Sequence, residues 1–194
     1  MSASRAVSNG RRKIKQNIKI ENISVLGKRE YEKNTNICGV SYEVGRDLTI
    51  PSIFGTVAEK HGDCYALYAG EVSLTFAELD RVSDKIARGL VNAGVKSGDS
   101  VAFMLNRDWR IIPTILGISK AGAAFIPVDP AYPKDRVSYI VENSKAAYLI
   151  SSVNVESSEE YDYLEIDRLI EFSDDSVKLP LVKQEDVAYI IYTS

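Results

Sequence analysis

Amphipathic repeats mark the first two helices of the chain. Apolar residues recur at a spacing of three to four over 50–61 and again over 75–93, which is the pattern of helices that bury one face. Thr75 and Glu78 begin the second repeat with a capping-box pattern, in which each side chain accepts a hydrogen bond from a free backbone amide. A short hairpin is predicted between the two helices, over 65–74.

Short apolar runs further along the chain predict strands. They comprise residues 101–105, 123–128, 147–150, 163–166 and 187–192. A run that is apolar on both faces is typical of a strand buried in a parallel sheet. Pro127 has no backbone amide hydrogen, so the second run is expected to lie at an edge of the sheet or to end early.

Two more helices are predicted between these strands, one over about 108–121 and one that opens at Pro133. Pro113 is compatible with the first of them only if that helix begins late enough to place the proline in its first turn, since an interior proline costs about 3 kcal/mol. Strands that alternate with amphipathic helices predict an α/β fold with a mainly parallel sheet and flanking helices.

Composition places the chain among ordinary globular proteins. Of its 194 residues, 45% are hydrophobic and 26% are charged, with a net charge of -3. No apolar stretch approaches the roughly 18–20 residues needed to span a bilayer, and residues 1–10 lack the apolar segment of a secretory signal. We therefore expect a cytoplasmic location and no membrane partner.

Charge separates the chain into two parts. Residues 1–33 contain nine Lys/Arg and three Asp/Glu, a net charge of +6, which leaves -9 for the remainder. Such a basic segment could meet nucleic acid or an anionic surface, but it lacks interleaved aromatic residues, so nucleic-acid binding is not expected. We interpret residues 1–45 as a polar, basic tail or linker and residues 46–194 as the organised domain.

Neither the cysteines nor the histidine indicates a catalytic or metal site. Cys38 and Cys64 lie far apart with no further ligand at metal-binding spacing, so two free thiols are favoured over a disulfide. His61 lies at the end of a predicted helix without a nucleophile nearby, and we expect it at the surface. No catalytic residue and no metal ligand is assigned.

Three segments carry a family resemblance. Residues 74–79 read L-T-F-A-E-L, residues 119–137 read S-K-A-G-A-A-F-I-P-V-D-P-A-Y-P-K-D-R-V, and residues 187–194 read V-A-Y-I-I-Y-T-S. In this order they resemble the first three core motifs of nonribosomal peptide synthetase adenylation domains. Those motifs are L-T-Y-x-E-L, L-K-A-G-x-A-Y-V-P-I-D and the run into Y-T-S-G-T-T-G-x-P-K-G. The resemblance covers about residues 48–194.

The resemblance implies a fold and a domain order. Residues 46–194 are similar to the N-terminal portion of the large adenylate-forming (acyl-CoA synthetase/luciferase-like) AMP-binding domain, cut off at the phosphate loop. Residues 1–45 resemble the linker that joins a condensation domain to an adenylation domain. The implied partners are the remaining adenylation sequence, in cis or in trans, together with condensation and carrier domains.

The resemblance also implies a reaction. The complete family domain joins the carboxylate of an amino acid to the α-phosphate of ATP with the help of Mg²⁺, and then transfers the aminoacyl group to a phosphopantetheine thiol on a carrier domain. Thr193 and Ser194 correspond to the first hydroxyl residues of the loop that binds the phosphates. The glycines and the lysine of that loop have no counterpart here, so tight binding of ATP or Mg²⁺ and activity of this chain alone are not expected.

Charged residues of the second motif are interpreted as structural. Lys120 lies at the end of a predicted helix, where its charge meets the helix dipole favourably. Asp129 and Asp135 stand beside prolines, where aspartate forms local hydrogen bonds in turns. We prefer these interpretations to a catalytic lysine and a carboxylate pair.

Two other functions stay open. The chain could be a non-catalytic relic or a docking subunit, with the basic tail and the sheet edge near 187–192 as contact surfaces. A fragment of an acyl- or aryl-CoA ligase is less favoured, because residues 131–133, Ala-Tyr-Pro, resemble peptide synthetases more closely.

Overall fold

The structure is a computed structural model that describes residues 48–152, 161–172 and 174–193. The predicted tail over 1–45, Cys38 and Ser194 lie outside these residues.

The first described elements are a helix, a hairpin and a long helix. Helix α2 (Ile50–His61) is followed by strands β1 (Tyr65–Ala69) and β2 (Val72–Thr75), which pair antiparallel, and then by α3 (Phe76–Ala93). The predicted capping box of α3 is confirmed, because the Thr75 amide donates to Glu78 Oε2 at 2.9 Å and the Glu78 amide donates to Thr75 Oγ1 at 3.2 Å. A second capping box, Thr49 with Ser52, begins α2.

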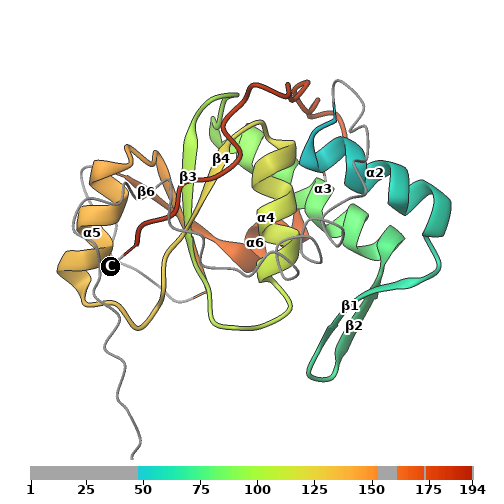
Figure 1. Ribbon diagram of the computed structural model, residues 1–194, viewed down its shortest axis with the longest axis horizontal. Helices are drawn as coiled ribbons and strands as arrows, with labels where there is room; N and C mark the ends of the chain where they lie inside the picture. The colour runs from blue at the N-terminus through green and yellow to red at the C-terminus, as the bar shows by residue number, and fades with distance from the viewer. Residues whose placement is uncertain (1–47, 153–160, 173, 194) are drawn as a thin grey trace, which may run out of the picture. The chain divides into compact units, whose positions relative to one another are not determined.

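A parallel sheet forms the centre of the domain (Figure 1). Its strands are β3 (Ser100–Met104), β4 (Ala124–Pro127), β5 (Tyr148–Ser151) and β6 (Asp162–Glu165), in the spatial order β4-β3-β5-β6. All neighbouring pairs are parallel, which confirms the predicted sheet.

Helix α4 (Ile111–Lys120) connects β3 to β4, α5 (Lys134–Asn143) connects β4 to β5, and α6 (Ile166–Glu171) follows β6. Helix α4 begins three residues later than predicted, and Pro113 is its third residue, where a missing amide costs no intrahelical hydrogen bond. The preceding turn is closed by the Asp108 carboxylate, which accepts a hydrogen bond from the Arg110 amide at 2.9 Å. Helix α6 was not predicted, because six residues are too few to show a clear repeat.

The two faces of the sheet bear different helices. Phe103 on β3 packs in an apolar cluster with residues of α3, α4 and α6, whereas its neighbour Ala102 packs with residues of α5. This alternation follows from the two-residue period of a strand. Both faces are therefore covered, which explains the apolar runs that marked these strands.

Helices α3 and α4 approach each other closely at Gly117. A Cβ atom at this position would lie 2.6 Å from Ile86 Cγ2, so only glycine allows the contact. Gly122, with φ of +76°, then turns the chain from α4 into β4, and its Cβ would lie 2.5 Å from Ser97 Oγ. Gly122 of the second motif thus supplies a small residue where the turn after α4 packs tightly against Ser97.

Candidate functional site

The segment that matches the third motif lies beside β4 but does not form a regular strand. The Phe125 amide donates to the Ala188 carbonyl oxygen at 3.1 Å, and the Ile190 amide donates to the Phe125 carbonyl oxygen at 3.1 Å. These two bonds make one parallel bridge between Phe125 and Tyr189, and Figure 1 shows the segment running along β4. The predicted strand over 187–192 is therefore wrong as a continuous element, and the one bridge that it forms is parallel.

Pro127 explains why the pairing does not continue toward the carboxyl end of β4. In a parallel ladder the next bond toward the end of β4 would come from the amide of residue 127, and proline has none. Strand β4 ends at this proline, as predicted.

The side chains of this segment alternate between two environments. Val187, Tyr189 and Ile191 are 64%, 55% and 58% exposed. Ile190 and Tyr192 pack instead against the cluster that contains α5, and the Tyr192 hydroxyl donates to Asn143 Oδ1 at 2.8 Å. This alternation matches an edge strand whose second face is uncovered among the described residues.

Thr193 directly follows this segment and is exposed. The other predicted phosphate-loop residue, Ser194, lies outside the described residues. Assignment of this pair to phosphate binding therefore stays a prediction.

A crevice opens at the carboxyl ends of β3 and β4. The connection from β3 leaves to α4 on one face of the sheet, and the connection from β4 leaves to α5 on the other. Open α/β sheets bind ligands where neighbouring connections diverge in this way. The crevice has a volume of about 580 Å³ and is lined by Phe103, Leu105, Asn106, Arg107, Ile111, Ile115, Pro127, Val128, Asp129, Pro130, Ala131, Tyr132, Ile191 and Tyr192.

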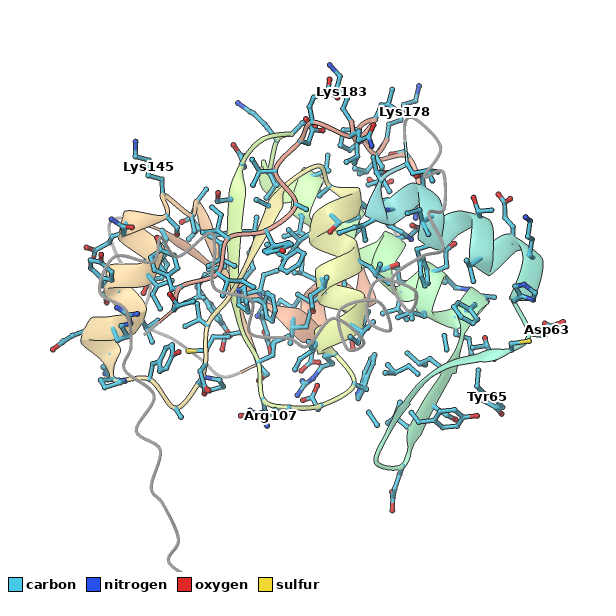
Figure 2. The ribbon with its side chains drawn as sticks, in the orientation of Figure 1. Asp63, Tyr65, Arg107, Lys145, Lys178 and Lys183 are labelled. Atoms are coloured by element: carbon cyan, nitrogen blue, oxygen red, sulfur yellow. The ribbon has the colours of Figure 1, made fainter. Side chains whose placement is uncertain are left out.

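Asn106 and Arg107 are polar residues of this crevice that the sequence analysis did not identify. Both are exposed in the turn after β3, and Figure 2 shows Arg107 at the outer side of that turn. Arg107 has no ion pair or hydrogen bond with another described residue. Their position directly after a buried apolar run was the available signal, because carboxyl ends of parallel strands meet at one edge.

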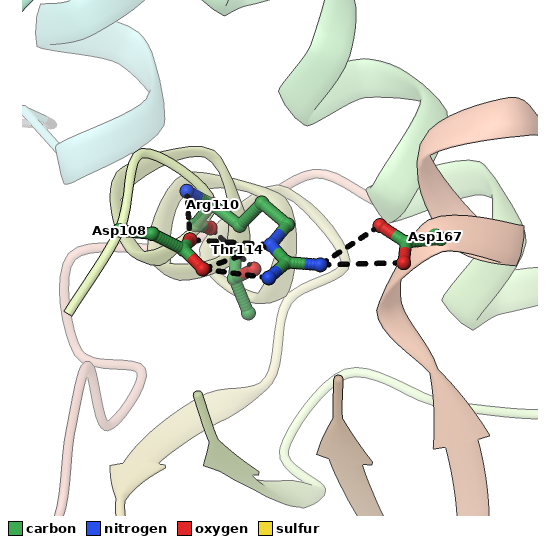
Figure 3. Close-up of polar contacts among 4 residues, drawn as sticks. All are labelled: Asp108, Arg110, Thr114 and Asp167. Atoms are coloured by element: carbon green, nitrogen blue, oxygen red, sulfur yellow. Dashed lines mark hydrogen bonds and ion pairs between the residues drawn. The ribbon is translucent and has the colours of Figure 1, made fainter. Parts of the chain in front are cut away.

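Arg110, by contrast, is fully engaged within the protein (Figure 3). Its Nη2 donates to Asp108 Oδ2 at 2.6 Å, and its Nη1 donates to both carboxylate oxygens of Asp167 at 3.1 and 3.2 Å. The hydroxyl of Thr114 donates to the Arg110 carbonyl oxygen at 2.7 Å. This cluster joins the turn before α4 to the first turn of α6 and so supports one wall of the crevice.

The same ion pairs shift the titration of both partners. Hydrogen bonds from the Arg110 side chain hold the pKa of Asp108 below its usual value, against a smaller opposing effect of burial. Hydrogen bonds to Asp108 raise the pKa of Arg110 further above its ordinary value. Asp108 and Arg110 therefore both stay charged through the neutral range.

Lys120 is buried by neighbouring carboxylates on α3. Its side chain is 8% exposed, and Nζ donates to Asp80 Oδ1 at 2.7 Å, to Asp84 Oδ1 at 2.6 Å and to the Asp80 carbonyl oxygen at 3.2 Å. All three ammonium hydrogens thus have acceptors. Lys120 does lie in the last turn of α4, but the structure identifies these acidic partners, rather than the helix dipole alone, as its environment.

The remaining predicted residues are also structural or exposed. Asp129 Oδ1 accepts a hydrogen bond from the Ala131 amide at 2.8 Å, which confirms the local turn. Asp135 lies in the first turn of α5, where an acidic side chain meets the positive end of the helix dipole. His61 and the free thiol of Cys64 are exposed.

The part of the chain that the structure describes shows no metal cluster and no membrane span. Within 48–152, 161–172 and 174–193, no group of three or more His, Cys, Asp or Glu side chains could hold a metal ion. None of the helices there is both long and apolar enough to cross a bilayer.

Comparison with known proteins identifies the family. The sequence profile described as "AMP-binding enzyme" matches residues 54–194, so the chain belongs to the AMP-binding enzyme family.

The relatives specify the kind of AMP-binding enzyme. The chain is 38% identical over 166 residues to tyrocidine synthase 3 of Brevibacillus parabrevis, which covers 82% of this chain and 2% of that protein. It is 33% identical over 179 residues to surfactin synthase subunit 1 of Bacillus subtilis (strain 168), which covers 90% of this chain and 5% of that protein. The similarity is to adenylation domains of nonribosomal peptide synthetases, and the chain spans a small part of each relative.

Solved structures agree with this assignment. The nonribosomal peptide synthetase FmoA3 matches with a TM-score of 0.73 and 26% identity over 87% of this chain and 18% of that one. The N-terminal subdomain of Klebsiella oxytoca NpsA, in complex with 3-hydroxybenzoyl-AMSN, matches with a TM-score of 0.69 and 27% identity over 75% of this chain and 37% of that one. The fold is therefore that of the N-terminal subdomain of adenylation enzymes.

Proposed function

We propose that residues 46–194 are the N-terminal platform of an amino-acid-activating adenylation domain. In the whole reaction, the carboxylate oxygen of an amino acid attacks the α-phosphate of ATP. Pyrophosphate leaves, and the aminoacyl group then passes from AMP to a carrier-domain thiol. The observation that carries the proposal is the position of the third-motif segment, which runs parallel to the edge strand β4 and leads toward the carboxyl end of the sheet.

The proposed role of this chain is support rather than chemistry. Mg²⁺ at nucleotide sites is usually held by one or two carboxylates together with the substrate phosphates. ATP and Mg²⁺ would be bound with further adenylation sequence, to which Thr193 and Ser194 would contribute the first hydroxyl groups of the phosphate loop. The platform would hold that loop in place, and the charged cluster at Arg110 would support the adjacent wall of the crevice.

Partners and location follow from the same proposal. The remaining adenylation sequence would act in cis or in trans, with a condensation domain before the 1–45 linker and a carrier domain after the adenylation domain. Such an assembly would work in the cytoplasm, where ATP and amino acids are available. We favour an amino acid over an aryl or acyl acid as the substrate, because the peptide synthetases above share up to 38% identity with the chain. The structural comparison does not separate these substrate classes, since the likeness is similar for FmoA3 and for NpsA in complex with 3-hydroxybenzoyl-AMSN.

A chimera tests the proposal. Residues 48–194 would replace the matching segment of the adenylation domain of a relative, and ATP–pyrophosphate exchange would be measured with the amino acid of that relative. We expect exchange from the chimera and none from the unfused chain or from the relative lacking its N-terminal segment. A chimera that unfolds cooperatively on heating, yet shows no exchange, would favour the relic or docking alternative.

A further inference from the structure

We infer that Phe125 is a positioning residue for the segment that carries Thr193. Its position relative to residues 187–193 can be tested directly, and the consequence for catalysis rests on the proposed function. Phe125 belongs to the second motif, whereas the segment belongs to the third. The second motif therefore not only packs a helix against a strand but also aligns the third-motif segment.

The backbone of Phe125 makes the pairing that aligns this segment with the sheet. Its amide and carbonyl groups bond to Ala188 and Ile190, each at 3.1 Å, and among the described residues no other backbone–backbone bond joins 187–193 to the sheet. Pro127 cannot donate a further hydrogen bond to the segment. If the backbone of Phe125 moves, no neighbouring bond on that side holds the segment in its original alignment.

The side chain of Phe125 reinforces the same pairing. Its ring lies 5.6 Å from the ring of Tyr189 and 6.5 Å from the ring of Phe103, centroid to centroid. Tyr189 is 55% exposed, so its ring is otherwise weakly constrained. The three aromatic rings connect β3, β4 and the segment in one row.

Phe125 is itself attached to the central sheet. Strand β4 pairs in register with β3, with Phe125 opposite Val101. Upstream, Gly122 forms its tight turn, and Lys120 is bonded to α3 through Asp80 and Asp84. The second motif thereby links α3 and α4 to β4, and the bridge at Phe125 links β4 to the start of the predicted phosphate loop.

A second anchor of the segment acts on the opposite face. The Tyr192 hydroxyl donates to Asn143 on α5 at 2.8 Å, and this is a single side-chain bond at an exposed site. It holds the end of the segment against α5, whereas the bridge at Phe125 sets its alignment along β4. Loss of the ring at Phe125 should therefore loosen the segment even with Tyr192 in place.

Amide hydrogen exchange in the whole 194-residue chain tests the local effect. Phe125→Ala should speed exchange of the Ile190 amide by about 5-fold or more, the size expected for weakening one hydrogen bond, and leave the amides of β5 unchanged. Phe76→Ala is the matched control, because Phe76 is also half-buried with an aromatic neighbour at 6.0 Å but lies away from the segment. Equal acceleration by both variants, or an unchanged Ile190 amide, would overturn the inference.

The chimera tests the catalytic consequence. There, Phe125→Ala should lower kcat/KM for ATP by about 10-fold or more, since small displacements of positioned groups are costly, while KM for the amino acid is unchanged. Phe125→Tyr should restore both readouts, and Phe125→Leu replaces the alanine variant if that variant does not fold. If the unsubstituted chimera is inactive, the proposed function fails, and amide exchange alone still decides the role of Phe125.

Discussion

The α3–α4 interface and the segment 187–193 are stabilised in opposite ways. At the interface, Ile86 is fully buried against Gly117, and the Lys120 ammonium has three acceptors on α3. The segment is joined to the sheet by one backbone bridge, and alternate side chains along it are more than half exposed. Lys120 belongs to the second motif of the family, and the segment belongs to the third.

This contrast separates the first and second motifs, which pack within the domain, from the third motif, which lies at its edge. Regions with many buried contacts open only with global unfolding, whereas weakly packed segments open locally and at lower cost. Loops that bind ligands commonly extend from a rigid scaffold. The comparison therefore predicts large stability effects at the interface and small ones in the segment.

The largest stability effect is expected for Lys120→Met. The substitution leaves Asp80 without its cation and leaves Asp84 with only Arg88, at 3.8 Å, and each carboxylate is about a third exposed. Because water still reaches them, the cost should lie below that of a fully buried pair, at about 2–3 kcal/mol. Urea unfolding measures the loss, with the exposed Lys96→Met as a control. Equal stabilities of the two variants would contradict the importance assigned to the bonds of Lys120 with Asp80 and Asp84.

A smaller, pH-dependent effect is expected for Asp108→Asn at the crevice wall. Because Arg110 lowers the pKa of Asp108 in the folded state, this carboxylate stabilises the fold above its unfolded pKa of about 3.9. That contribution is lost as the pH falls through the folded pKa. The variant should be less stable by about 1 kcal/mol at neutral pH.

The pH dependence of unfolding distinguishes this effect from general damage. The stability difference between Asp108→Asn and the unsubstituted chain should shrink below about pH 4. Asp167→Asn is the comparison, since the Asp167 side chain is 56% exposed and should contribute less. A difference that persists unchanged in acid would rule out the ion pair as its cause.

The smallest stability effect is expected for Ile191→Lys in the segment. An exposed side chain contributes little to folding, so the change should stay within about 0.5 kcal/mol. We expect the uncovered apolar edge at 187–193 to make the chain self-associate, and a charged side chain there should reduce this by blocking pairing of edge segments. Sedimentation velocity of the whole chain measures it, with Ile53→Lys on α2 as the exposed control. A large loss of stability would mean that the segment belongs to the core.

Much of the scaffold could be predicted from neighbouring residues. Thr75 and Glu78 are three apart, and their capping box depends on that spacing alone. The apolar runs predicted the parallel strands because a strand covered on both faces has no polar side. Pro127 predicted the end of β4, since a proline cannot donate a backbone hydrogen bond wherever it is placed.

The sequence by itself thus determined the elements whose causes are local: helix caps, strand runs and the position of Pro127. Only the tertiary structure decided which distant groups meet. Lys120 bonds to Asp80 and Asp84, 40 and 36 residues away, and Arg110 bonds to Asp167, 57 residues away. It also decided that residues 187–192 pair through one bridge rather than along a full strand. The physical reason is that these contacts depend on the order of strands and on which partner lies at an edge, and a local pattern contains neither.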